Sequence, residues 1–452
     1  MLDKKLPFVV GILFSFLISP VYSQYTMPAE WEEHTGTWLQ WPHDYTYGPG
    51  SRDYFEQAWI EMTMELTKGE DVFIIAYDET ELIHIQDVLS SAGVNFDRIV
   101  FYTFPNNDYW IRDNGPIYVR NEIGELAATD WGFDGWGNDA PYALCNEIPS
   151  LIALATGIPL LDVNEMVLEG GAIEHDGNGT FMATESSILG DNRNPGKTKS
   201  DLEDYLSEYL GFEKFIWLEG SYGGSFDITD SHIDGFLKFH NKDTIVTMSN
   251  ADLAYWYVNA SDRTIISEAT NVDGEGFEYV YLPLTDKNVK TTDNLNTGSK
   301  GSYVNYYVAN SVVLVPTYND DNDSIAIAIL QEIMPEKEVV GIDCRNMFLW
   351  GGMVHCVTQQ QPSGSFATTV TEGAANSFLI EVSPNPIHNI CTVQHPRQTD
   401  YLIISDIQGR ELFTTATTGN STQLSVTNLS SGQYLIMASG DFGTITRKVI
   451  IE

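Results

Sequence analysis

Short apolar runs alternate with segments of helical period along the middle of the chain. Residues 71–78, DVFIIAYD, are rich in β-forming side chains, and residues 80–93 follow with apolar positions spaced as on one face of a helix. Residues 53–69 show the same helical spacing and end at a glycine, as helices commonly do. Further strand-like runs lie at 98–104, 243–249 and 311–316, and further helix-like runs at 201–210 and 324–333. This alternation predicts an α/β domain.

The pattern changes after Gln361. Residues 363–377 are small and polar and predict a linker. Over residues 378–452, short alternating runs bounded by turn residues recur about every ten positions, without a helical period. The runs are NICTVQ, YLIISD, ELFTTAT, QLSVTN, GQYLIMASG and TRKVIIE. They predict a small all-β sandwich domain of about 75 residues.

Residues 1–23 have the order of a secretory signal peptide. A start with two lysines is followed by about thirteen apolar residues and then by Val21-Tyr22-Ser23. We therefore expect the α/β domain to occupy residues 24–362 of an exported chain. The apolar run is shorter than a bilayer span, and no later stretch reaches about 18 uninterrupted apolar residues, so we expect no stable membrane span after cleavage.

The 452 residues carry a formal net charge of −40 but are 43% apolar, so the chain can bury a large core. This charge argues against nucleic acid or an anionic membrane as partner, because both attract positively charged proteins. It favours small cationic ligands, although acidity that only keeps the protein soluble is the alternative. The four cysteines, Cys145, Cys344, Cys356 and Cys391, are too few and too scattered for a disulfide framework and have no metal-ligand spacing. Whether any of Cys145, Cys344 and Cys391 pair stays open.

Four short stretches of the α/β domain carry candidate chemistry. They are WIRDNGP with Asp113, LEGGAIEHDGNGT with Glu169, ITDSHIDGF with His232 and Asp234, and GGMVHCVTQQQP with Cys356. Each alone has a simpler explanation, since an aspartate before Gly-Pro suits a turn and a lone cysteine is more often a core residue. If the His-x-Asp stretch is a strand, both of its side chains lie on one face.

Taken together, the four stretches combine a thiol nucleophile, a histidine and several carboxylates. Carboxylates bind a guanidinium through paired, charge-assisted hydrogen bonds. A cysteine then attacks the central carbon, and a histidine protonates the departing nitrogen. Free cysteine has a pKa of roughly 8.5, which nearby carboxylates raise and a bound cation lowers. We therefore expect the thiolate of Cys356 to form when a cationic substrate arrives.

With three further stretches, the chain resembles the family of agmatine deiminases and bacterial, Porphyromonas-type peptidylarginine deiminases over about residues 25–362. The further stretches are MPAEWEEHTGTWLQWPHD, DNRNP and SYVNYYVANSVVLVP. The resemblance implies a pentein fold, an α/β propeller of five ββαβ-type units around a pseudo-fivefold axis with the active site at its centre. One departure is Ser231, where the family commonly has glycine.

The same resemblance implies roles for named residues. Cys356 corresponds to the nucleophile, His232 to the general acid and base, and Asp113 and Asp234 to the carboxylates that hold the guanidinium. Glu169, Trp110 and Asn305 correspond to further substrate-site positions. The implied reaction is hydrolysis of a C–N bond of a linear amidine through a covalent thiouronium, without metal or organic cofactor.

The far end of the substrate is the open question. No Lys or Arg occurs from Asn121 to Asn192, an interval that contains the aromatic and acidic stretch DWGFDGWGNDAPY. A substrate carboxylate there lacks a cationic partner, whereas an amine meets acidic residues. This favours agmatine, converted to N-carbamoylputrescine and ammonia in putrescine biosynthesis. The alternative is peptidyl arginine converted to citrulline, with Arg193 or Arg345 supplying the missing charge, and export favours it because agmatine deiminases are mostly cytosolic.

The C-terminal region resembles the sorting domain of type IX secretion in the stretches SPNP (383–386), DIQGREL (406–412), LSSGQYLIMA (429–438) and TRKVIIE (446–452). This implies a secreted or cell-surface protein that the type IX machinery carries across the outer membrane; an ordinary adhesive sandwich is the alternative. Two rival functions stay open. A non-catalytic binding protein on a deiminase scaffold is disfavoured by the intact Cys/His/Asp/Asp set, and a cysteine peptidase by the number of carboxylates.

Overall fold

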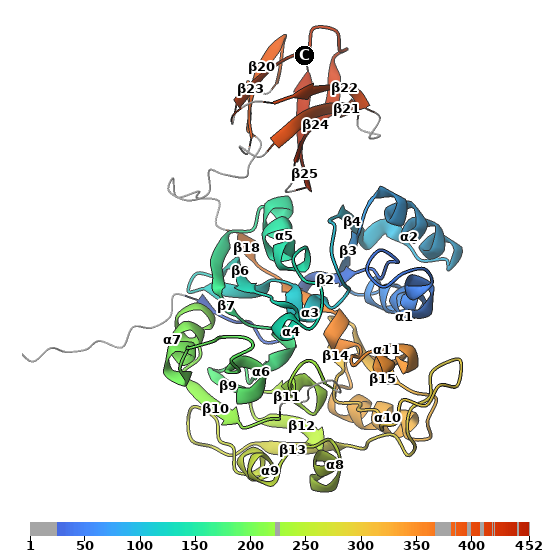
Figure 1. Cartoon of the computed structure of the whole chain (residues 1–452), viewed down its shortest axis with the longest axis vertical. Helices are drawn as coiled ribbons and strands as arrows, with labels where there is room; N and C mark the ends of the chain where they lie inside the picture. Colours follow the sequence, from blue (N-terminus) through green and yellow to red (C-terminus); the bar gives the residue numbers. More distant parts are fainter. Residues whose placement is uncertain are drawn as a thin grey trace, which may run out of the picture.

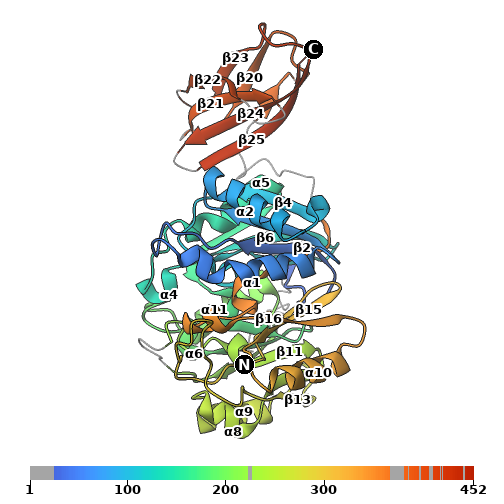
Figure 2. The same cartoon turned by 90° about the vertical axis from the view of Figure 1, so that its right-hand side faces the viewer.

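A computed structural model of the chain describes residues 25–221 and 227–366 and, with short gaps, residues 381–451. Figures 1 and 2 show a large α/β part and a separate β-rich part formed by the C-terminal residues. The predicted signal peptide lies outside the described residues, as do residues 367–377 of the predicted linker and residues 378–380 of the predicted sandwich domain. Among the described residues, no helix is both long enough and apolar enough to cross a bilayer.

One arrangement of strands recurs five times between residues 34 and 362. In each unit an antiparallel strand pair is followed by at least one helix and by a third strand parallel to the second. The first strands are β5 (Ile117–Asn121), β8 (Ile173–His175), β11 (Leu237–Asn241), β14 (Tyr307–Val308) and β17 (Gln359–Pro362). The second strands are β6 (Glu125–Gly132), β9 (Thr180–Thr184), β12 (Thr244–Met248), β15 (Val312–Thr317) and β2 (His34–Gln40). The third strands are β7 (Leu160–Val167), β10 (Lys214–Leu218), β13 (Glu278–Leu282), β16 (Glu338–Asp343) and β3 (Asp71–Ala76).

Helices connect the second and third strands of the units. They are α5 (Ile148–Thr156), α7 (Lys199–Leu210), α8 (Asn250–Tyr255) with α9 (Ala260–Ser267), α10 (Asp323–Ile333) and α1 (Ser51–Leu66). The unit around β2 takes its first strand, β17, from the far end of the domain. It also carries an extra helix, α2 (Glu79–Ser91), and an extra parallel strand, β4 (Ile99–Thr103). The unit around β2 is therefore completed only by β17, a strand from the other end of the domain.

Local sequence explains why these elements form where they do. Strand β3 lies between two parallel neighbours and is buried on both faces, which accounts for its unbroken apolar run. Helix α2 begins after Asp78, whose side chain accepts hydrogen bonds from the backbone N–H groups of Thr80 and Glu81 at 2.9 Å each. Helix α7 begins with a capping box of Thr198 and Asp201. The predicted helices and strands of the α/β domain are confirmed as α1, α2, α7, α10, β3, β4, β12 and β15, within three residues at each end.

The C-terminal residues form two antiparallel sheets around a core of their own. One sheet has three strands and the other four, and eleven buried residues between Ile387 and Ile451 form the core. The strands are β19 (Glu381–Ser383), β20 (Ile390–Gln394), β21 (Thr399–Asp406), β22 (Glu411–Ala416), β23 (Ser421–Ser425), β24 (Gly432–Gly440) and β25 (Gly443–Ile451). All six predicted strands are confirmed as β20 to β25.

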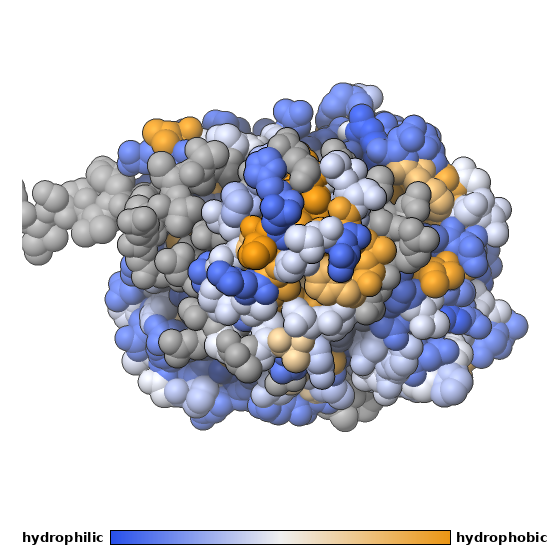
Figure 3. Space-filling view, turned by 90° about the horizontal axis from the view of Figure 1, so that it is seen from above, coloured by the Kyte–Doolittle hydropathy of each residue, from blue (hydrophilic) through white to orange (hydrophobic). Residues whose placement is uncertain are grey.

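The C-terminal region and the segment before it each show a feature that the sequence pattern does not predict. Figure 3 looks onto this end of the molecule and shows apolar side chains gathered near the middle of the face. Residues 365–366, inside the segment predicted as linker, form a short strand, β18 (Ser365–Phe366), that pairs with β6. The α/β domain therefore includes these two residues.

Candidate active site

The first strand of each unit is preceded by a short segment, and these five segments hold six of the predicted site residues. Asp113 lies in α3 (Ile111–Asn114), Glu169 precedes η3 (Gly170–Ala172), and Cys356 lies in η6 (His355–Val357). His232 and Asp234 belong to η5 (Ile233–Gly235) and the residue before it, and Asn305 lies directly before β14. Segment α3 contacts both η3 and η6, and η3 contacts η5. Repetition of one unit thus brings residues far apart in sequence to one place.

His232 and Asp234 do not lie on a strand. Their segment is a 3-10 turn that enters β11, and the strand begins only at Leu237. Asp230 and Ser231, just before it, adopt φ angles of 56° and 71°, which non-glycine residues rarely tolerate. Hydroxyl groups of Ser186 and Thr184 hold the backbone oxygens of these two residues at 2.7 and 2.9 Å. The strained turn presents both side chains to the site although they are not strand neighbours.

Two adjacent glycines in LEGG allow the segments to meet. A Cβ at Gly170 would lie 2.2 Å from the backbone oxygen of Arg112, so only glycine lets η3 approach α3. A Cβ at Gly171 would lie 2.7 Å from Asp113 Oδ1, 2.8 Å from His232 Nδ1 and 3.1 Å from Asp234 Oδ2. Three polar side-chain atoms therefore surround a point that the missing side chain leaves open.

His232 is held by carboxylates on both sides. Its Nε2 lies 2.7 Å from Glu169 Oε2, and its Nδ1 lies 3.6 Å from Asp113 Oδ1. Burial alone would lower the pKa of His232, but Asp113, Glu169 and Asp234 outweigh burial and raise it to about 9. His232 is therefore protonated near neutral pH.

Cys356 has two neighbours that bear on its ionisation. Its Sγ lies 3.8 Å from Asp234 Oδ2 and accepts a hydrogen bond from Asn305 Nδ2 at 3.4 Å. Burial, followed by the charges of Asp234 and Asp113, raises the pKa of the thiol well above its usual range. Cys356 is therefore a neutral thiol in the unliganded site, as the surrounding carboxylates led us to expect.

The two aspartates of the site ionise differently. Burial raises the pKa of Asp113 to about 6, although the charge of His232 opposes the rise. Burial acts on Asp234 in the same direction, but the hydrogen bond and charge of His355 and the charge of His232 overcome it and lower the pKa of Asp234. Near neutral pH, Asp234 is firmly ionised, whereas Asp113 is close to its titration.

Glu169 does not stand free to receive a substrate. Its Oε1 accepts from Arg193 Nε at 2.7 Å, and its Oε2 faces His232. Arg193 also donates to Asp230 Oδ2 at 3.0 Å, and its side chain has no exposed surface. Glu169 thus connects a buried arginine to the histidine of the site.

Trp110, the seventh predicted site residue, lies in the wall beside the cysteine turn. It precedes α3, and its ring occupies the space that a side chain at Gly352 would fill, with a built Cβ only 2.1 Å away. The Gly-Gly pair before Cys356 therefore lets η6 approach Trp110.

Sequence reasoning missed Trp136 as a site residue. Its indole Nε1 donates to Asp113 Oδ2 at 3.0 Å, and its side chain is buried. The only sequence signal is the flanking glycines of Gly-Trp-Gly, which permit an unusual backbone. His355 was also missed, although it precedes the nucleophile: its Nδ1 lies 2.8 Å from Asp234 Oδ2.

Among the described residues, no group of three or more His, Cys, Asp and Glu side chains is arranged to hold a metal ion.

Comparison with known proteins agrees with this geometry. Residues 26–362 match the model of the Porphyromonas-type peptidyl-arginine deiminase family, and residues 381–452 match the secretion system C-terminal sorting domain. The chain belongs to this deiminase family. An agmatine deiminase of Pseudomonas syringae pv. tomato is 30% identical over 372 residues, covering 76% of this chain and 97% of the relative.

Solved structures of related deiminases are similar in fold. The agmatine deiminase of Enterococcus faecalis superposes with a TM-score of 0.68 at 26% identity, over 75% of this chain and 96% of that one. The agmatine deiminase of C. jejuni gives 0.63 at 26% identity, over 76% and 97%. The deiminase domain is therefore that of a hydrolase of amidine C–N bonds, and the C-terminal sorting domain indicates export or display at the cell surface.

Proposed function

We propose that this deiminase hydrolyses agmatine or a similar alkylguanidine, and that Cys356, His232, Asp113 and Asp234 carry the reaction. The observation that supports this most is the convergence of Asp113, His232 and Asp234 on the open point beside Gly171, with Cys356 Sγ 3.8 Å from Asp234. A planar guanidinium placed there donates hydrogen bonds to two carboxylates while its central carbon faces the thiol.

The reaction then proceeds in two halves. As the guanidinium binds, the Cys356 thiol loses its proton to solvent. The thiolate Sγ then bonds to the guanidinium carbon, His232 transfers a proton to one nitrogen, and ammonia leaves with the C–N bond pair, so that a thiouronium remains on the cysteine. His232, now neutral, takes a proton from water, whose oxygen bonds to the same carbon. The C–S bond breaks, which frees the ureido product and regenerates the thiol. Glu169 and Arg193 keep His232 aligned through both halves.

The positive charge of the substrate promotes formation of the thiolate nucleophile. Cys356 is neutral while the site is empty because burial and two aspartates oppose the thiolate. A bound guanidinium offsets the aspartate charges and lowers the pKa of the thiol. The thiolate thus forms in the presence of the substrate it attacks, which protects the cysteine of an exported enzyme from oxidation.

The pairing of β17 with β2 supports closure of the five units into a pentein ring. This strand pair joins the last segment of the domain to its first unit, and the five turns meet at one place. A closed pseudo-fivefold ring places these turns around the axis, where each unit contributes one edge of the site.

The pairing of Arg193 and Arg345 with carboxylates supports an amine rather than a carboxylate at the substrate's far end. Arg193 is bound to Glu169 and Asp230. Arg345 is bound to Asp343, with Nη2 to Oδ2 at 2.7 Å. Both arginines that could have paired with a substrate carboxylate are thus already neutralised, which favours agmatine and N-carbamoylputrescine as substrate and product.

Peptidyl arginine is the second candidate, and the sorting domain favours it because peptides are available outside the cell. We propose that the full route of export runs through an N-terminal signal peptide and the type IX machinery. Whether the sorting domain stays attached is separate from the chemistry, because it has its own core.

The test is release of ammonia and ureido product by the full chain with agmatine, free arginine and a peptide ending in arginine. Cys356→Ser is the control for chemistry. We expect turnover of agmatine at the highest kcat/KM. Preference for the peptide would mean that another group replaces the missing cation, and no turnover of any guanidine would favour a binding protein on this scaffold.

A further inference from the structure

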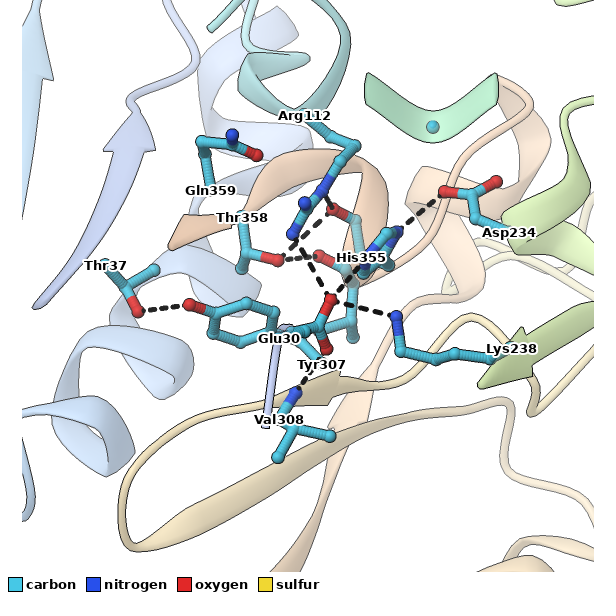
Figure 4. A network of polar contacts seen from close by, with 12 residues as sticks. Glu30, Thr37, Arg112, Asp234, Lys238, Tyr307, Val308, His355, Thr358 and Gln359 are labelled. Atoms are coloured by element: carbon cyan, nitrogen blue, oxygen red, sulfur yellow. Dashed lines mark hydrogen bonds and ion pairs between the residues drawn. The ribbon is translucent and has the colours of Figure 1, made fainter. Parts of the chain in front are cut away.

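Cys356 is preceded by a second histidine, which no step of the reaction uses. His355 is buried, and both of its ring nitrogens face carboxylates: Nδ1 lies 2.8 Å from Asp234 Oδ2, and Nε2 lies 2.8 Å from Glu30 Oε2. Figure 4 shows the imidazole between these two acids. We propose that His355 is a positioning residue that holds the Asp234 carboxylate in the direction from which it receives the guanidinium; this inference rests on the proposed function.

The oxygen that His355 binds is the one that faces the site. Asp234 Oδ2 lies 3.8 Å from Cys356 Sγ and 3.1 Å from the point where a Cβ of Gly171 would lie. A carboxylate on a short turn can rotate about χ2, which is a broad torsion. One hydrogen bond from a fixed imidazole removes that freedom and keeps Oδ2 directed at the reacting groups.

The imidazole is itself fixed, because Glu30 is anchored by three other parts of the fold. Glu30 Oε2 accepts from Lys238 Nζ at 2.9 Å, and Oε1 accepts from the backbone N–H of Val308 at 2.9 Å. Arg112 Nη2 lies 3.7 Å from Oε2. Lys238, Val308 and Arg112 belong to β11, β14 and α3, so three units of the fold support Glu30, which orients His355, which orients Asp234.

The number of hydrogen-bond donors explains why residue 355 is a histidine. A protonated imidazole donates from both nitrogens and satisfies both carboxylates, which no neutral side chain of this shape does. A buried charge network of this kind is expensive in stability. Because His355 lies one residue before the nucleophile, we assign this network to holding the geometry of the site rather than to stabilising the fold.

The backbone of residue 355 contributes separately. Its N–H donates to Asn305 Oδ1 at 3.0 Å, and Asn305 Nδ2 donates to Cys356 Sγ. A side-chain substitution leaves that backbone contact in place. The effect of the imidazole can therefore be measured apart from that of the main chain.

Two amide substitutions of different length test the two hydrogen bonds of the imidazole separately. Asparagine places its amide nitrogen near the position of Nδ1 and can still donate to Asp234. Glutamine reaches the position of Nε2 and can still donate to Glu30. Each variant loses one buried, charge-assisted hydrogen bond, so the two lose similar stability, but only His355→Gln releases Asp234.

We expect KM for agmatine to stay within about threefold of the wild type in His355→Asn and to rise about 10- to 100-fold in His355→Gln, the worth of a hydrogen bond to a charged group. The dissociation constant of agmatine, measured by calorimetry in a Cys356→Ser background, should change in parallel, and the two variants should melt at similar temperatures. A larger loss in His355→Asn, or equal KM values in the two variants with an active wild type, overturns the positioning role. A wild type that neither binds nor turns over any guanidine overturns the proposed function itself, and this inference with it.

Discussion

Gly171 shows how much of this site depends on an absent side chain. The three polar groups that surround the open point come from two units, Asp113 from one and His232 and Asp234 from another, and each lies within about 3 Å of the place where a Cβ would be. A methyl group there competes directly with the substrate. The neighbouring Gly170 has a different reason to be glycine, since it faces backbone rather than site groups.

We therefore expect Gly171→Ala to lose at least about 100-fold in kcat/KM through misplacement of the reacting groups, while the protein stays folded. Only the ends of side chains need to move to admit the methyl group. Gly170→Ala is the matched control: it presses on the backbone oxygen of Arg112 and should lower the melting temperature. Steady-state kinetics and thermal unfolding of both variants test this, and an active Gly171→Ala would contradict the location of the substrate.

The thiol of Cys356 offers a second test at this scale. Because its pKa lies well above the usual range, alkylation by iodoacetamide in the absence of substrate should rise with pH through a midpoint above about 8.5, the value for free cysteine. Cys356→Ser provides the background, since the other three cysteines are buried. A midpoint near 6 would show that the thiolate exists before the substrate arrives and would remove substrate-induced ionisation from the mechanism.

Among the elements, the turn over residues 135–138 is the most unusual. Gly135, Trp136, Gly137 and Asn138 have φ angles of 70°, 57°, 83° and 69°, four left-handed residues in a row. Glycine and asparagine tolerate this region, but a tryptophan there costs about 1–2 kcal/mol. The turn keeps this strain because it brings the indole N–H to Asp113, so the aromatic stretch serves the site through geometry.

Trp136→Phe retains a ring and removes the hydrogen bond to Asp113. We expect kcat/KM to fall about tenfold, the lower value for a bond to a charged group. Because this bond lowers the pKa of Asp113, its loss should also move the acid limb of the pH profile to higher pH. Trp131→Phe is the control in the same stretch, since its indole donates to Thr129 instead. An unchanged pH profile in Trp136→Phe would contradict the role of the turn.

The ionisation of Asp113 in α3 and of His232 at the start of η5 predicts the pH profile of the wild type. Asp113 must be ionised to hold the guanidinium, so activity falls as the pH drops through about 6. His232 must be protonated to release ammonia, so activity falls as the pH rises through about 9. We expect a bell-shaped kcat/KM with these two limbs, which belong to the coupled pair, and a further rise with pH between them because the free enzyme holds Cys356 as a neutral thiol. A profile that rises steadily to pH 10 would exclude protonated His232 as the acid.

For the whole molecule, the two parts have separate hydrophobic cores. Buried residues of the C-terminal sandwich cluster only with one another, between residues 387 and 451. The clusters of the deiminase domain end at Val357, and β17 completes the sheet of β2. The deiminase domain is therefore complete without the sorting domain, but not without its own last strand.

A chain of residues 24–366 should keep the kcat/KM of the full mature chain and unfold at a similar temperature. A chain of residues 24–350 should not fold stably, because it loses β17 along with Cys356. Kinetics and calorimetry of the two truncated proteins test this. Loss of activity in the longer one would show that the sorting domain supports the deiminase site.

The sequence alone determined the parts whose signal is local. Runs of apolar residues identified α1, α2, α7 and α10 and the buried strands, because side-chain periodicity reflects which face is buried. Composition separated the C-terminal sandwich from the deiminase domain. The residue types in four short stretches were enough to indicate guanidine chemistry, since few substrates call for a thiol, a histidine and several carboxylates at once.

Only the tertiary structure decided how those residues work. Strands such as β8 and β14 have three and two residues, too short for a periodic signal, and they exist because the next strands, β9 and β15, pair with them in the folded units. The convergence on Gly171 and the link from Glu30 through His355 to Asp234 join residues from different units, and the contact of Trp136 with Asp113 joins residues 23 positions apart within one unit. The unequal ionisation of Asp113 and Asp234 follows from burial and distance, which are properties of the folded arrangement rather than of any stretch of sequence.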